Sequence, residues 1–226
     1  MTPRRLYIDS IAVAVAVMPS GLAFGATAVT SGFSAAQACF LSLAMFTGAS
    51  QFALVGVLGG GGSVGAALSV AWGLGARNGL YAARLSSTLP ASPWRRASAA
   101  QLVLDESMAM SVTRDDPAVA RAAFWATGLS LFVLWNVGTL IGALAGTFIE
   151  DPRTLGLDTA FPAAFLALVW PQVRGRPAIA TAATSALVAC ATVPLLPRGL
   201  PVLVCAFAVI SGIGVSGRRS FTERST

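Results

Sequence analysis

Three charged residues stand among apolar neighbours in the middle of the chain and could carry out chemistry there. Arg77 follows a long apolar run, and Asp105 and Glu106 lie on the next helical segment along the chain. An ionised side chain at membrane depth is costly and generally has a partner or a function. We therefore expect Arg77 to pair with Asp105 or Glu106, either as a static buried ion pair or as a coupling pair that opens to bind a substrate or a proton.

Uncharged polar residues extend this set along three apolar runs. Thr47 and Gln51 are four residues apart and would share one face of a helix, Asn78 follows Arg77, and Asn136 lies in a later run. Such side chains either hydrogen-bond a neighbouring helix or line a polar pathway. The predicted substrate-binding residues are accordingly Thr47, Gln51, Arg77, Asn78 and Asn136.

The segment PSGLAFG at 19–25 places a proline and two glycines inside the first apolar run. A helix broken at Pro19, Gly21 and Gly25 would free backbone groups at membrane depth, and the N-terminus of a half-helix attracts a carboxylate. Alternatively, Pro19 only kinks the helix and the glycines form a notch for close packing. A later ladder at four-residue spacing is typical of helix packing, within the chain or with a partner: Gly138, Gly142 and Gly146.

The elements that must position these residues are membrane helices. Hydrophobic residues make up 55% of the 226 residues and charged residues only 11%, against about 25% charged in soluble domains. We expect an all-α, polytopic integral membrane protein that contacts lipid along its length. Apolar runs long enough to span a membrane occur near 6–27, 35–58, 64–86, 122–149, 159–173, 178–197 and 200–217.

The number of spans depends on the segment 98–113, which is apolar at helical spacing but carries acidic residues. If it crosses, about eight helices span the membrane and the N-terminus is cytoplasmic; if it lies on the interface, about seven span and the N-terminus is outside. Either way we expect one permease domain over 1–226, with short cytoplasmic or peripheral tails at 1–5 and 218–226. In the loop before 159–173, Asp158 either caps a helix whose first turn holds Pro162, which is the favoured interpretation, or serves as a proton site.

Composition also excludes several functions. The net charge of +6 comes from arginines at the ends of apolar runs, as in cytoplasmic loops, and no basic face for nucleic acid is present. The sequence has no His and no Lys, which removes Ser-His and Ser-Lys nucleophilic chemistry and His-based metal sites. Its cysteines are isolated: Cys39, Cys190 and Cys205. We expect no enzyme, no metal and no cofactor.

Several long segments resemble one family in the right order along nearly the whole chain. They are PSGLAFG at 19–25, FTGASQFALVG at 46–56, LDES at 104–107, VGTLIG at 137–142 and LGLDTAFPAAFLALVWP at 155–171. The chain thus resembles the AzlC family, the large subunit of bacterial branched-chain amino acid exporters. The resemblance implies a multi-pass protein of the bacterial cytoplasmic (inner) membrane. It also implies ion-gradient-driven export of Val, Leu, Ile and similar amino acids together with a small AzlD-like membrane subunit.

One position departs from the family pattern, which usually reads Asn-x-Arg-His. This chain reads Gly75-Ala76-Arg77-Asn78, so substrate or proton handling can differ here.

Our first hypothesis is a permease whose polar seam binds a zwitterionic amino acid. Arg77 or a half-helix N-terminus would take the carboxylate, and Asp105 or Glu106 the amino group or a coupling proton. The alternative is a non-transporting scaffold or regulatory subunit of a partner permease, as the glycine ladder suggests.

Overall fold

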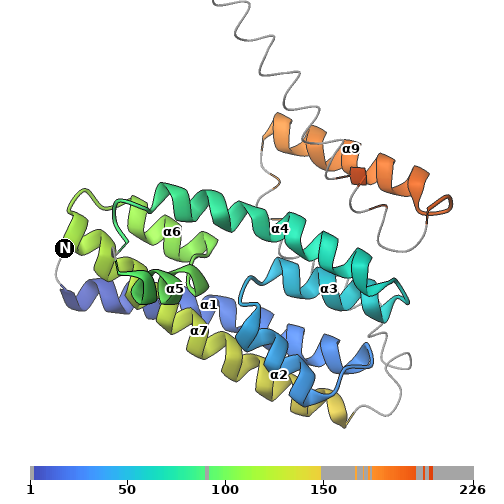
Figure 1. Ribbon diagram of the computed structural model, residues 1–226, viewed down its shortest axis with the longest axis horizontal. Helices are drawn as coiled ribbons and strands as arrows, with labels where there is room; N and C mark the ends of the chain where they lie inside the picture. Colours follow the sequence, from blue (N-terminus) through green and yellow to red (C-terminus); the bar gives the residue numbers. More distant parts are fainter. Residues whose placement is uncertain are drawn as a thin grey trace, which may run out of the picture.

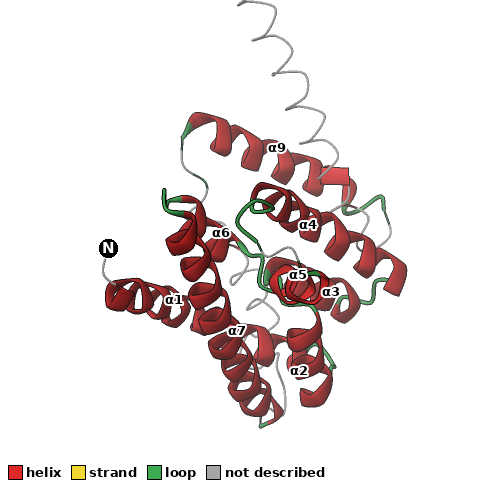
Figure 2. Ribbon diagram, turned by 60° about the vertical axis from the view of Figure 1, so that its left-hand side comes forward, coloured by secondary structure: helices red, strands yellow, loops and turns green. Residues whose placement is uncertain are grey.

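The computed structural model describes residues 3–89, 92–148 and 175–196, together with the isolated residues Leu166, Trp170, Val173, Pro201, Val204 and Cys205. Figure 2 shows that the described part of the chain consists of helices joined by loops, which confirms the expected all-α class. The helices are α1 (Pro3–Thr30), α2 (Ala35–Ala44), α3 (Ala49–Gly59), α4 (Val64–Arg84), α5 (Pro93–Gln101), α6 (Asp105–Val112), α7 (Pro117–Thr147) and α9 (Arg176–Thr192) (Figure 1). The predicted spans at 159–173 and 200–217, with Asp158 and Pro162, lie almost wholly outside the described residues.

The long helices α1 and α7 lie side by side and form the base of the molecule in Figure 1. Within the described residues these two are long and apolar enough to cross a membrane, over Arg4–Thr30 and Pro117–Thr147. Buried hydroxyls reinforce the packing on α7: the Thr127 hydroxyl donates to Ser10 of α1 at 3.0 Å, and Ser42 of α2 lies 3.1 Å from Thr139. Such bonds between helices are typical of membrane bundles.

Helix α1 is continuous from Pro3 to Thr30, so the predicted break at Pro19, Gly21 and Gly25 is wrong. Pro19 is exposed, whereas Gly21 and Gly25 are buried against the α7 backbone. A Cβ on Gly21 would come within 2.7 Å of the Trp135 carbonyl oxygen, and one on Gly25 would overlap the carbonyl oxygen of Thr139. The close-packing alternative therefore describes this segment.

Breaks occur instead in two later segments. The run 35–58, expected as one span, is divided into α2 and α3 at residues 45–48. The segment 98–113 is divided into α5 and α6 by residues 102–104, all of which are buried. There the Ser107 hydroxyl accepts from the Leu104 amide at 3.0 Å and donates to the Leu102 carbonyl at 2.6 Å. The side chain thus satisfies backbone groups that the break leaves without helical partners.

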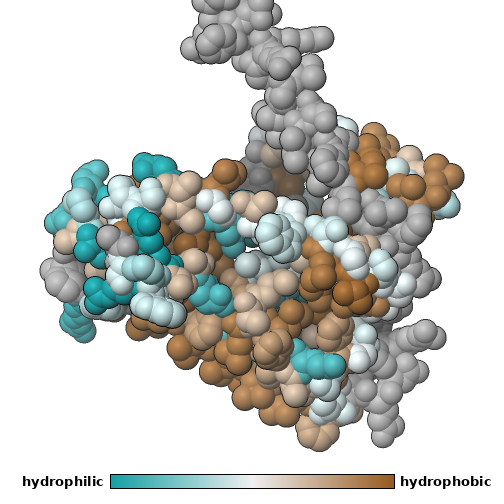
Figure 3. All heavy atoms as spheres, in the orientation of Figure 1, coloured by the Kyte–Doolittle hydropathy of each residue, from teal (hydrophilic) through white to brown (hydrophobic). Residues whose placement is uncertain are grey.

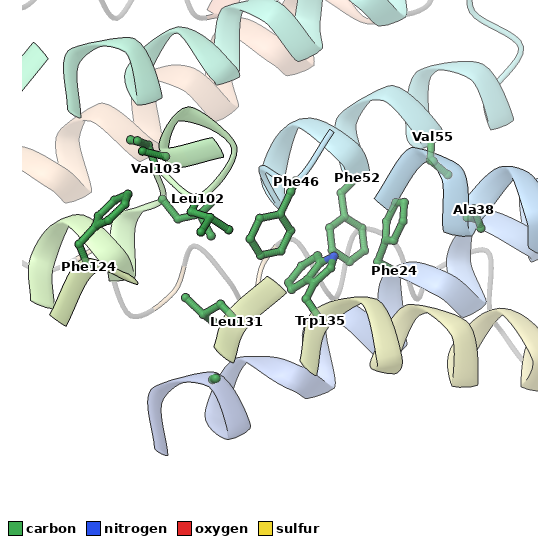
Figure 4. Close-up of a cluster of buried hydrophobic side chains, with 14 of the residues drawn as sticks. Phe24, Ala38, Phe46, Phe52, Val55, Leu102, Val103, Phe124, Leu131 and Trp135 are labelled. Carbon is green, nitrogen blue, oxygen red and sulfur yellow. The ribbon is translucent and has the colours of Figure 1, made fainter. Parts of the chain in front are cut away.

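An aromatic cluster packs the α2–α3 break against α1 and α7 (Figure 4). Phe24 meets Phe52 edge-on with ring centroids 5.4 Å apart and stacks on Trp135, and Phe46 meets Phe132 at 5.1 Å. Outside this core, large apolar side chains face outward along both long helices, including Ile11, Val15, Leu129 and Val133. Hydrophobic residues cover much of the face in Figure 3, and hydrophilic residues gather at one end. This distribution suits a surface in contact with lipid.

Candidate functional site

The unwound segment between α2 and α3 consists of Met45, Phe46, Thr47 and Gly48. Gly48 has φ of +59°, a conformation that residues with a Cβ rarely adopt. A Cβ there would also lie 3.6 Å from the Trp135 ring. The glycine therefore allows the chain to turn between two short helices directly above the aromatic cluster.

Gln51 joins the two sides of this break. Its side-chain oxygen accepts from the Gly48 amide at 3.2 Å, and its Nε2 donates to the Leu41 carbonyl of α2 at 3.3 Å. The side chain is fully buried, so both ends of the amide are occupied by the backbone of the break. Thr47 lies outside α3, and the prediction that Thr47 and Gln51 share one helical face is therefore wrong.

A second glutamine secures the same break from outside the segment. Nε2 of Gln101, the last residue of α5, donates to the Leu43 carbonyl at 2.8 Å and to the Ala44 carbonyl at 3.4 Å. These carbonyls belong to the last turn of α2, which has no helical donors left for them. Gln101 could not be predicted from the sequence, because the need for a donor appears only once α2 is known to end at Ala44.

A cavity of about 360 Å³ lies where this break meets α4. Ligand pockets commonly begin at about 300 Å³. The polar residues in its described lining are Thr47 and Ser50, and the other lining residues are apolar or small. The lining residues are Met45, Thr47, Ser50, Ala71, Trp72, Gly75, Ala76 and Gly79.

The predicted ion pair forms next to this cavity. Arg77 Nη1 lies 3.0 Å from Asp105 Oδ2, which links α4 to α6, and the two side chains are 37% and 40% exposed. The Tyr81 hydroxyl, one turn after Arg77, interacts with the same carboxylate. Glu106 is half-buried and forms no salt bridge within the described residues. Of the two acidic residues expected as partners of Arg77, Asp105 forms the ion pair.

The structure does not gather all the predicted binding residues in one place. Thr47 lines the cavity, but Gln51, Asn78 and Asn136 do not, and Ser50 was not predicted. Asn136 donates to the Phe132 carbonyl of its own helix at 2.7 Å, and its Oδ1 is buried with no partner among the described residues. Ser50 could not be distinguished from many other small polar residues until the helix was known to begin beside it.

Comparison with known proteins identifies the family to which this chain belongs. A family model described as AzlC protein matches residues 12–149, a range that holds both breaks, the cavity and the ion pair. The chain belongs to the AzlC family. This is a family of membrane proteins, generally transporters, associated with branched-chain amino acid transport. No solved structure matches the chain.

Its relatives carry names that agree with a membrane location. An uncharacterized membrane protein of Archaeoglobus fulgidus is 32% identical over 76% of this chain and 77% of its own length. The inner membrane protein YgaZ of Escherichia coli is 28% identical over 71% of this chain and 64% of its own length. An uncharacterized membrane protein of Helicobacter pylori is 25% identical over 73% of each chain. Together with the apolar helices, these findings confirm a multi-pass protein of the inner membrane.

Proposed function

We propose that this AzlC protein is a permease that exports branched-chain or other aliphatic amino acids. An ion gradient drives the export, and a small AzlD-like membrane subunit acts with it. The observation that carries the proposal is a broken helix, with a cavity at the break, inside the region that matches the family. Many membrane transporters bind substrate at discontinuous helices, whose free backbone groups meet polar groups of the substrate.

The ion pair supplies a means of coupling. Asp105 attracts Arg77 while its carboxyl group is ionised, and a proton arriving on Asp105 removes that attraction. Because Arg77 is on α4 and Asp105 is on α6, release of the pair frees α4 to move relative to α6. Protonation from the proton-rich side of the membrane would in this way change the shape of the cavity that α4 lines.

The alternative, a non-transporting scaffold, loses its main support. It was suggested by the glycine ladder of α7, and the structure fills that ladder within the chain. A Cβ on Gly138 would lie 2.9 Å from the Met18 carbonyl oxygen, and one on Gly146 would lie 3.2 Å from the Val29 side chain. The ladder thus packs α1 and is not available to a partner.

The test is efflux of Val, Leu, Ile and Met, loaded as dipeptides, from cells that lack their own exporters. We expect saturable efflux when the chain is expressed with an AzlD-like subunit, and none with either protein alone. The variant Arg77→Gln should reach the membrane at normal levels and export nothing. Absence of efflux of all four amino acids would overturn the proposal, and full export by Arg77→Gln would overturn the coupling role.

A further inference from the structure

We infer that the cavity at the α2–α3 break binds the carboxylate of the transported amino acid, through the N-terminus of α3 and the hydroxyls of Thr47 and Ser50. The inference rests on the proposed function, because it identifies the part of the molecule that recognises the substrate. The carboxylate site then lies away from Arg77 and from the first helix, the two places expected from the sequence.

Two backbone amides in the first turn of α3 have no hydrogen-bond partner among the described residues. The Gly48 amide is occupied by Gln51, and the amides of Gln51 and Phe52 donate to the Gly48 carbonyl at 3.0 and 3.2 Å. The amides of Ala49 and Ser50 make no hydrogen bond within the described residues. The N-terminus of a helix also carries a partial positive charge, so these amides favour an anion.

Two hydroxyls at the same place have no partner. Thr47 Oγ1 is completely buried and makes no hydrogen bond in the described part of the chain. Ser50 is 2% exposed, and its hydroxyl likewise has no hydrogen bond there. Both residues line the cavity. A buried hydroxyl without a partner costs free energy that a ligand oxygen would recover.

The charges around the cavity favour a carboxylate over an ammonium group. Among the described residues, no acidic or basic side chain lines the cavity, so the positive end of α3 acts there without a competing charge from a described lining side chain. Arg77, next to the lining residue Ala76, is already paired with Asp105. An incoming carboxylate would compete with Asp105 for Arg77, whereas the amides of Ala49 and Ser50 in α3 have no described partner.

The rest of the lining suits an aliphatic side chain. Met45, Ala71 and Trp72 present apolar surface, and glycines keep the space open. A Cβ on Gly75 would lie 3.6 Å from Ser50 Oγ, in the volume immediately beside the hydroxyl. The cavity therefore has hydrogen-bond donors at one wall and apolar side chains at the others. A branched-chain amino acid requires both.

The test measures protection of a cysteine in the full chain with its small subunit. In a background with Cys39, Cys190 and Cys205 replaced by alanine, Ser50→Cys and, separately, Thr47→Cys are labelled with a small methanethiosulfonate reagent. The competitors are leucine, 4-methylpentanoate, which lacks the amino group, and 3-methylbutylamine, which lacks the carboxylate. The matched control is Ser69→Cys, an exposed serine of α4 outside the cavity lining.

Leucine and 4-methylpentanoate at ten times their Kd should slow labelling at position 50 or 47 about tenfold, and 3-methylbutylamine should not. Labelling of Ser69→Cys should be unchanged by all three. Equal protection by 3-methylbutylamine would overturn the carboxylate assignment. Absence of protection at both positions, in protein that still binds radiolabelled leucine, would overturn the site.

A separate outcome distinguishes this inference from the proposed function. If the wild type exports no amino acid but 4-methylpentanoate still protects position 50, the carboxylate site stands and the amino acid permease does not. Conversely, if Ser50→Ala and Thr47→Val export leucine with unchanged KM, the permease stands and this site does not.

Discussion

Glycines perform opposite tasks in the two halves of this helical bundle. Between α1 and α7 they bring two backbones together: a Cβ on Gly138 would lie 2.9 Å from Met18 O, and one on Gly142 would overlap the Leu22 carbonyl oxygen. On α4 they leave space. Gly65, Gly73 and Gly79 have no described atom within 4 Å of an added Cβ. The same residue type therefore marks a closed interface in one place and an open surface or cavity in the other.

This difference separates a fixed part of the molecule from a part that can change shape. The α1–α7 interface is held by backbone contact along its length and by the buried hydroxyl pair of Thr127 and Ser10, which leave little freedom to move. The α3–α4 region combines an unwound segment, a cavity and an ion pair between half-exposed side chains. Transporter cycles require one element to move against another that stays fixed, and these two regions have the matching properties.

The largest expected effect is on the closed interface. Gly25→Ala or Gly142→Ala places a methyl group where the opposite backbone stands, and backbone cannot rotate aside as a side chain can. Overpacking of this kind costs about 1–3 kcal/mol or more. We expect a large drop in the thermal unfolding temperature in detergent and a loss of protein from the membrane. Normal stability of both variants would mean that α1 and α7 are not in backbone contact.

The next effect concerns the glutamine that joins the break. Gln51→Leu leaves the Gly48 amide and the Leu41 carbonyl without their partners at partly buried positions, at roughly 0.5–1 kcal/mol for each group. We expect denaturant unfolding to show this loss and export to fall. Gln101→Leu is the matched control, because its hydrogen bonds lie at the exposed edge of the break. An equal stability loss in both variants would show that the buried position of Gln51 gives its hydrogen bonds no greater weight than those of Gln101.

The sequence predicted the membrane class and the ion pair but not the location of the helix break, for a physical reason. Composition alone gives the membrane class, and the cost of an isolated charge predicts that Arg77 pairs with Asp105 or Glu106, between which the sequence does not decide. The location of the break could not be predicted in the same way. Pro19 is typical of a helix break, but it faces outward from α1, which packs on α7 and stays continuous. Gly48 is a weaker signal in the sequence, and the break there depends on Gln51 and Gln101, which hydrogen-bond the backbone groups at the ends of α3 and α2. Tertiary contacts, absent from local sequence, decided between the two.

The open region should respond to added methyl groups with the opposite sign. Gly73→Ala adds a Cβ that meets no described atom and removes the conformational freedom of glycine from the unfolded chain. Alanine is favoured over glycine inside a helix by about 0.5–1 kcal/mol, so we expect a slightly higher unfolding temperature. A stability loss like that of Gly25→Ala would show that another helix lies against this face of α4.

The smallest expected effect on stability belongs to the ion pair, although its effect on export is expected to be complete. Polar pairs between membrane helices couple by about 0.6 kcal/mol on average, and half-exposed side chains leave Arg77 and Asp105 little beyond that. A double-mutant cycle of Arg77→Gln and Asp105→Asn should therefore give a small coupling energy in unfolding measurements. If the coupling energy instead exceeded the stability loss of Gln51→Leu, the ion pair would be mainly structural. It would then hold α4 to α6 too firmly for α4 to move and open the cavity. A weak pair is what a coupling device needs, because a bond that must form and break in every cycle cannot also hold the fold.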